Sequence, residues 1–187
     1  WSSVATATPM GPLGIAQPTA ATIGDGSVQV FWAEPVTTGG FKGLVSYQVF
    51  FRPFGTQTWL SGPKSLTART TLLAGLVNGT TYEIGIMAQT DDGGLVRELG
   101  TITATPEAAP TLSYATPSNW PQNTPITLTA TVAQLQGAGA YTIESGALPT
   151  GLSLEPSTGV ISGTPTIQQS ISATVRLTDG TTGLFTD

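Results

Sequence analysis

The sequence predicts an all-β chain made of tandem β-sandwiches, immunoglobulin-like in class, and three observations support this prediction. Apolar residues alternate with polar ones in short runs, turn residues separate these runs about every 8–12 residues, and no stretch keeps a helical period. Charged residues make up only 9% of the chain, whereas Thr, Ser, Gly and Pro are abundant. The hydrophobic fraction of 39% provides enough apolar residues for packed cores, so the low charge does not indicate disorder.

Three runs show the alternation most clearly: Val28–Trp32, Tyr47–Phe51 and Tyr82–Ala88. Each run places its apolar residues on one face of a strand, because successive side chains of a strand point to opposite faces. Turn residues such as Gly24-Asp25-Gly26 and Asn78-Gly79 separate the predicted strands. We therefore expect the large aromatic residues of these runs to lie in the core, namely Trp32, Tyr47 and Tyr82.

A proline-containing segment divides the chain near its middle. Pro106 and Pro110 cannot both lie inside a central strand, because proline lacks the amide hydrogen that a strand ladder needs. They make a short and stiff linker. We therefore assign residues 18–106 to a first sandwich and residues 107–187 to a second.

The N-terminal segment, residues 1–17, is expected to hold the end of a preceding module and a linker. Thr6-Ala7-Thr8-Pro9 recurs as Thr103-Ala104-Thr105-Pro106, and the offset is about the length of one sandwich domain. The chain begins Trp1-Ser2-Ser3 without an initiator Met, so we do not expect Trp1 to be a natural start.

A specific loop sequence lies in the first predicted sandwich: Leu76-Val77-Asn78-Gly79-Thr80-Thr81-Tyr82. Together with Pro18 and the strand patterns at 28–32 and 47–52, it resembles a fibronectin type III domain. The resemblance implies that the Tyr82 hydroxyl bonds to nearby backbone, that Leu76 fills the core beneath the loop, and that Asn78-Gly79 accommodate positive φ. The family's Arg-Gly-Asp attachment tripeptide is absent, so an integrin-type function is not implied.

The second predicted sandwich contains a long hairpin pattern, Leu-Pro-Thr-Gly-Leu-Ser-Leu-Glu-Pro-Ser-Thr-Gly-Val-Ile-Ser-Gly-Thr-Pro, at positions 148–165. Leu152 and Leu154 would point inward from one strand, and Val160 and Ile161 would belong to the next. The turn between them is Pro156-Ser157-Thr158-Gly159, in which glycine supplies a left-handed conformation.

This pattern, with the opening Pro110-Thr111-Leu112-Ser113-Tyr114, resembles an immunoglobulin-like family found in bacterial surface and phage-associated proteins. The matching residues are structural, so the resemblance implies no catalytic role. The family continues with a strand, a turn and a final strand. Ala173–Leu177 and Asp179-Gly180 supply the first two, but only Leu184–Asp187 remain for the last. We expect this last strand to be cut short, and its open edge to be covered by further residues or by a partner.

Composition excludes several kinds of chemistry. The chain has no histidine and no cysteine, which removes Ser-His-Asp and Cys-His nucleophiles, disulfides and thiolate metal sites. The net charge is −5 and Lys and Arg are not clustered, so neither nucleic acid nor an anionic membrane surface is an expected partner. No apolar run reaches about 18 residues, so no membrane insertion is expected. We expect no cofactor and no catalytic or metal-binding residue.

Two tryptophans, Trp59 and Trp120, are the candidate ligand contacts, because an aromatic face can stack on a sugar ring. For Trp59, an exposed or half-packed place in the scaffold is the preferred interpretation. The acidic pair Asp91-Asp92 is interpreted as a solvated turn rather than a calcium site. The Asn78-Gly79-Thr80 glycosylation sequon is explained by its place in a turn.

The remaining acidic candidates do not form a pattern typical of a glycosidase pair. They are scattered through ordinary strand and turn sequences, so we interpret none of them as catalytic: Glu34, Glu83, Glu98 and Glu144.

The leading hypothesis is a non-enzymatic structural or adhesive segment of an extracellular appendage, either a phage tail or virion fibre or a bacterial surface adhesin. Its partners would be neighbouring modules of the same chain, identical subunits or other virion proteins, and a host-surface glycan or protein. One alternative is an accessory spacer or carbohydrate-binding region of a secreted polysaccharide hydrolase. Another is a self-assembling sheath or decoration protein. These functional expectations rest on fold-level analogy.

Overall fold

The computed structural model describes Gly14 and residues 16–35, 44–90, 100–116, 121–167 and 172–187. The regular secondary structure in these ranges consists of fifteen β-strands, which confirms the predicted all-β class. The chain divides into two compact units, Trp1–Glu107 and Ala108–Asp187, and each is described by itself below. Within the described ranges, no helix has the length and apolar character needed to cross a membrane.

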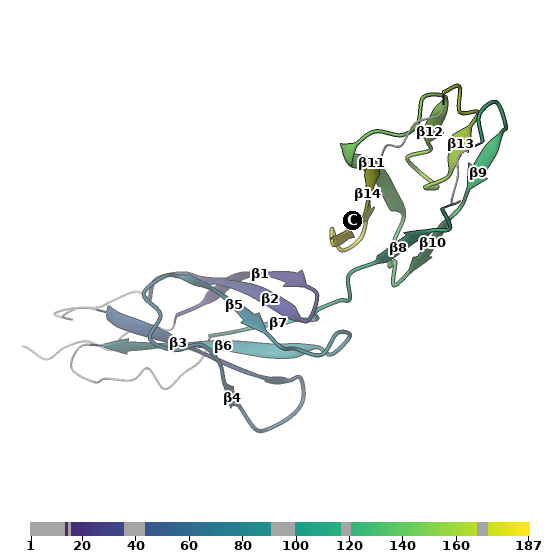
Figure 1. Cartoon of the computed structure of the whole chain (residues 1–187). Helices are drawn as coiled ribbons and strands as arrows, with labels where there is room; N and C mark the ends of the chain where they lie inside the picture. The colour runs from purple at the N-terminus through teal and green to yellow at the C-terminus, as the bar shows by residue number, and fades with distance from the viewer. Residues whose placement is uncertain (1–13, 15, 36–43, 91–99, 117–120, 168–171) are drawn as a thin grey trace, which may run out of the picture. The chain divides into compact units, whose positions relative to one another are not determined.

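The first unit is a sandwich of two antiparallel sheets, which face each other as two layers in Figure 1. One sheet has the order β1-β2-β5 and the other has the order β4-β3-β6-β7. The strands are β1 (Pro18–Gly24), β2 (Ser27–Trp32), β3 (Leu44–Pro53), β4 (Leu60–Ser61), β5 (Thr70–Ala74), β6 (Tyr82–Thr90) and β7 (Gly100–Ala104).

The core of the first unit lies between these two sheets. Val28 and Val30 of β2 are fully buried, as are Ile84 and Ile86 of β6, because alternate side chains of each strand face the same layer. The predicted aromatic core is confirmed: Trp32, Tyr47 and Tyr82 are all buried. The rings of Trp32 and Tyr47 meet edge to face, with their centroids 5.3 Å apart, a favourable geometry for an aromatic pair.

The loop before β6 forms the predicted tyrosine corner. The Val77 N–H donates to the Tyr82 hydroxyl over 3.1 Å, and Leu76 is buried beneath the loop. Gly79 has a φ of 74°, as expected, but Asn78 does not adopt positive φ. The Asn78 side chain instead accepts a hydrogen bond from the Gly26 N–H at 2.7 Å and so holds the β1–β2 turn against this loop.

The second unit is built from three small antiparallel sheets, with the orders β10-β8, β12-β13-β9 and β11-β14-β15 (Figure 1). Its strands are β8 (Thr111–Tyr114), β9 (Ile126–Leu128), β10 (Ala130–Ala133), β11 (Gly139–Gly146), β12 (Leu152–Leu154), β13 (Ile161–Gly163), β14 (Ala173–Asp179) and β15 (Phe185–Thr186). Its buried core consists of Tyr141, Ile161, Val175 and Leu177, and half-buried apolar residues surround it.

The 148–165 segment forms the β12–β13 hairpin. Leu152 and Leu154 are half-buried and pack against the core, and Gly159 has a φ of 69°. The second strand begins at Ile161 rather than at Val160. The Val160 carbonyl still accepts the Glu155 N–H over 2.8 Å, so it closes the turn instead of joining the ladder.

Strand β14 is paired unequally along its two edges. Strand β11 pairs with its whole length, from Ala173 to Asp179. Strand β15 pairs with it only at Leu177 and Thr178. In the described part of the chain, Ala173–Arg176 therefore have a strand partner on one edge only.

Candidate functional site

Trp59, a candidate ligand contact, lies beside an ion pair on the four-stranded sheet of the first unit. Arg52 of β3 and Glu83 of β6 are directly opposite each other, and their side chains meet at 2.7 Å. The Arg52 guanidinium also lies 4.3 Å from the centroid of the Trp59 ring, within the range of a cation–π contact. One face of the half-buried Trp59 ring is thus already occupied by a side chain of the same unit.

Glu34 and Glu144 each face an arginine of their own unit. Glu34 faces Arg69 at 3.5 Å on an exposed surface, and Glu144 faces Arg176 at 3.0 Å in the second unit. Trp120, Asp91-Asp92 and Glu98 lie outside the described residues. Among the residues that the structure describes, no group of three or more acidic, His or Cys side chains could share a metal ion.

Asp179, at the end of β14, is a structural carboxylate, although its sequence context, Asp179-Gly180, predicted only a turn. It is buried, and its carboxylate accepts four backbone hydrogen bonds. The donors are the N–H groups of Thr182 at 3.0 Å, Gln136, Thr181 at 2.7 Å and Gly137 at 3.3 Å. These bonds favour the charged form and lower the pKa of Asp179 to about 2, even though burial opposes the shift.

The four bonds of Asp179 define its role. They tie the loop before β11 to the turn between β14 and β15, so one side chain fixes how β15 leaves the sheet. All of its donors are backbone groups, so the carboxylate stabilises loops rather than acting as a free acid. The sequence carries a signal for this role, because Asp at a strand end followed by Gly-Thr-Thr is typical of an Asx turn.

Arg176 holds β15 from the outer face of β14. Its guanidinium makes two parallel bonds to Asp187, at 2.6 and 2.8 Å, and lies 4.3 Å from the centroid of the Phe185 ring. A hydrogen bond from Arg176 lowers the pKa of Asp187, and Arg176 also contacts Glu144 of β11. Arg176 therefore links all three strands of this sheet.

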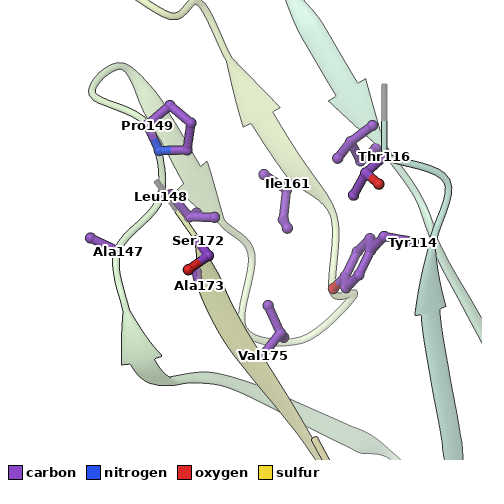
Figure 2. Close-up of a pocket in the computed structure, with 10 residues that line it drawn as sticks. Tyr114, Thr116, Ala147, Leu148, Pro149, Ile161, Ser172, Ala173 and Val175 are labelled. Carbon is purple, nitrogen blue, oxygen red and sulfur yellow. The ribbon is translucent and has the colours of Figure 1, made fainter. Parts of the chain in front are cut away.

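Two hollows of about 320 Å³ each lie beside the open edge of β14. They share four lining residues, and we name the two hollows together the β8–β14 groove. In Figure 2, Tyr114 and Thr116 lie on one side, Leu148 and Ala173 on the other, and Ile161 and Val175 between them. The full lining is Leu112, Ser113, Tyr114, Thr116, Leu128, Ala147, Leu148, Pro149, Ile161, Ser172, Ala173, Thr174, Val175 and Asp187.

The groove is chemically suited to apolar side chains. Ile161 and Val175 are core residues that reach its surface. The Tyr114 hydroxyl already donates to the Gly159 carbonyl over 2.6 Å, and burial raises the pKa of this tyrosine. The charged lining residue, Asp187, is paired with Arg176. The expectation of an open edge at the last strand indicated this region, but no sequence pattern indicated the hollow itself.

Comparison with known families identifies one match in the second half of the chain. Residues 100–187, just under half of the sequence, match the model of the He_PIG family, described as "Putative Ig domain". This match begins at β7, before the second compact unit starts at Ala108. No curated protein matches the sequence.

Several solved structures are similar to the chain. Titin module A71 from human cardiac muscle is 27% identical, with a TM-score of 0.40, over 50% of this chain and 88% of that one. The twitchin kinase region from C. elegans is 16% identical, with a TM-score of 0.42, over 94% of this chain and 30% of that one. The central fibronectin-III array of RIM-binding protein is 13% identical, with a TM-score of 0.39, over 89% of this chain and 64% of that one. The chain thus spans less than two thirds of the length of the twitchin and RIM-binding protein structures.

Proposed function

We propose that this protein of immunoglobulin-like and fibronectin-III-like domains is a non-enzymatic structural and adhesive segment of an extracellular appendage. The appendage would be a phage tail or virion fibre, or a bacterial surface adhesin. The observation that carries the proposal is that the charged side chains Asp179, Arg176 and Arg52 make their contacts within their own unit, where they hold its loops and strands together. Asp179 binds loops, Arg176 binds strands, and Arg52 joins Glu83 to Trp59.

The distribution of charge supports this proposal. The second module, residues 107–187, carries five acidic residues and one basic residue, and Arg176 is already engaged by two carboxylates. Such a surface offers little attraction for polyanions. Its partners under this proposal are neighbouring modules, identical subunits or other virion proteins, and a host-surface glycan or protein.

The location can be tested by immunogold electron microscopy with antibodies raised against the purified chain. Particles and cells of the source organism should carry gold label on a tail, a fibre or the cell surface. Antibody that has been absorbed with the purified chain is the control and should leave the same structures unlabelled. Label that is absent from both particles and cell surfaces, with the protein free in the medium, would contradict the proposal.

A glycan array separates the adhesive role from an accessory role in a polysaccharide hydrolase. Binding to a polysaccharide that is lost in Trp59→Ala and kept in Leu72→Ala would favour the accessory role. Leu72 is a matched control, because it is an exposed apolar residue on the other sheet of the same unit. Binding that is unaffected by Trp59→Ala would place any glycan contact elsewhere.

A further inference from the structure

One asparagine side chain of the first unit joins two turns that are far apart in sequence. The β1–β2 turn contains Asp25-Gly26, and the loop before β6 contains Asn78-Gly79. The Asn78 side-chain nitrogen donates to the Asp25 carboxylate over 2.7 Å, and its side-chain oxygen accepts the Gly26 N–H over the same distance. Asn78 therefore makes a two-bond contact between segments more than fifty positions apart.

The Asn78-Gly79 dipeptide also has the covalent structure needed to lose its side-chain amide. Asparagine is a thermally labile residue, and a following glycine, which has no Cβ, lets its nitrogen approach the asparagine side chain closely. The Gly79 nitrogen loses its proton to hydroxide and attacks Cγ of Asn78. The new C–N bond closes a succinimide ring, and the side-chain nitrogen takes a proton and leaves as ammonia. Water then opens the ring at either carbonyl, which gives aspartate or isoaspartate.

In the folded unit, the groups that must react are held by other partners. The Gly79 N–H donates to the buried Pro106 carbonyl over 2.8 Å, while the Asn78 side chain is bonded to the β1–β2 turn. Attack on Cγ requires both groups to leave these partners. Access of water does not limit the reaction, because Gly79 is exposed and nothing lies within 4 Å of a Cβ built on it. The rate therefore depends on how often these hydrogen bonds open.

We propose that Asn78 is a deamidation site which the folded first unit protects, and that its product loosens the contact between the two turns. Aspartate or isoaspartate at this position has no amide to donate to Asp25, and it places a second negative charge beside that carboxylate. Isoaspartate also lengthens the backbone of the loop in which Tyr82 binds the Val77 N–H. The inference goes beyond the proposed function, because it concerns the covalent lifetime of the chain.

Peptide mapping by mass spectrometry tests the protection. The chain is incubated at mildly alkaline pH, either folded in buffer or unfolded in guanidinium chloride, and deamidation is followed at Asn78. We expect the reaction to be about tenfold or more slower in the folded chain, because only the open fraction reacts. Asn123, which precedes Thr124, is the internal reference. It should react more slowly than Asn78 in denaturant, because a branched side chain hinders the attack.

Two matched pairs of variants identify the groups responsible. Gly79→Ala should suppress the reaction in denaturant. Gly75→Ala, at a similar φ of 76° and in equally open space, should not. Asp25→Ala should speed the reaction severalfold in the folded chain and leave it unchanged in denaturant. Glu34→Ala removes an exposed carboxylate that faces Arg69 instead, and should change neither rate.

Asn78→Asp reproduces one product directly and tests the loosening. It should lower the urea midpoint of the first unit, because the contact with the β1–β2 turn loses a donor and gains a repulsion. Added salt should raise this midpoint by more than it raises that of the unmodified chain, because salt screens the repulsion with Asp25.

Each part of the proposal can be overturned by one of these results. Equal rates at Asn78 in the folded and unfolded chains would show that the fold does not protect it, and no reaction in denaturant would show that it is not a site. A folded Asp25→Ala chain that reacts no faster would remove the role of that bond, and an unchanged midpoint for Asn78→Asp would remove the loosening. If Asp25→Ala does not fold, the unmodified chain with and without denaturant still decides whether the fold protects Asn78.

Discussion

At the scale of single residues, Asp179 and Tyr82 both hold loops through polar bonds, but their partners lie at different distances along the sequence. Asp179 bonds to Gln136 and Gly137, more than forty positions earlier, as well as to its own turn. Tyr82, by contrast, bonds to Val77 within one loop. The tyrosine corner was predicted because its partner is local. The bonds of Asp179 to the loop at Gln136 and Gly137 were not predicted, because no pattern in the sequence joins the two segments.

The low pKa of Asp179 predicts a pH-dependent stability for the second unit. The folded-state pKa is about 2 and the ordinary value is 3.8, so the stabilisation is complete above about pH 4 and is lost as the pH falls toward 2. Asp179→Asn should lower the urea midpoint of this unit at neutral pH, because an amide cannot accept all four bonds. It should also flatten the dependence between pH 4 and 2. Parallel pH profiles for both chains would contradict this prediction.

At the scale of elements, the β12–β13 turn is held in place by two tyrosines from other strands. The Tyr114 hydroxyl donates to the Gly159 carbonyl, and the Tyr141 N–H donates to the Pro156 carbonyl over 2.8 Å. The Tyr141 ring also lies so close to Gly159 that an added Cβ would be 2.5 Å from its Cε1 atom. Gly159 is thus required both for its positive φ and for the space that this ring occupies.

Two glycine-to-alanine substitutions separate these two requirements. Gly183 has a similar φ of 72°, and no atom lies within 4 Å of a Cβ added there. Gly183→Ala should therefore lower the unfolding free energy only by the left-handed strain, about 1–2 kcal/mol. Gly159→Ala should cost roughly 1–3 kcal/mol more, because the Tyr141 ring must shift. Urea unfolding of the second unit measures both values. Equal losses of unfolding free energy would show that the ring does not constrain the turn.

At the scale of the whole molecule, the chain contains two separate cores, one in each unit. The predicted linker of Pro106 to Pro110 spans the division between the units. Because each core is closed within its own strands, we expect damage to one core to leave the other unit folded.

Matched core substitutions test this independence. Ile84 in the first unit and Leu177 in the second are both fully buried. Replacing either with alanine should lower the unfolding free energy of its own unit by about 2–5 kcal/mol, through lost burial and the resulting cavity. Differential scanning calorimetry should show one transition moving and the other unchanged. A single transition that shifts equally in both variants would indicate one cooperative unit.

The β class, the inward faces of the main strands and the tyrosine corner could all be predicted from the residues alone. These features depend on residues within a few positions of each other, such as the alternation of Val28, Val30 and Trp32. Tertiary structure alone decided the contacts of Asp179, the packing of Tyr141 on Gly159 and the hollow beside β14. The physical reason is that a period of two specifies which face a side chain takes, but not which strand lies opposite that face.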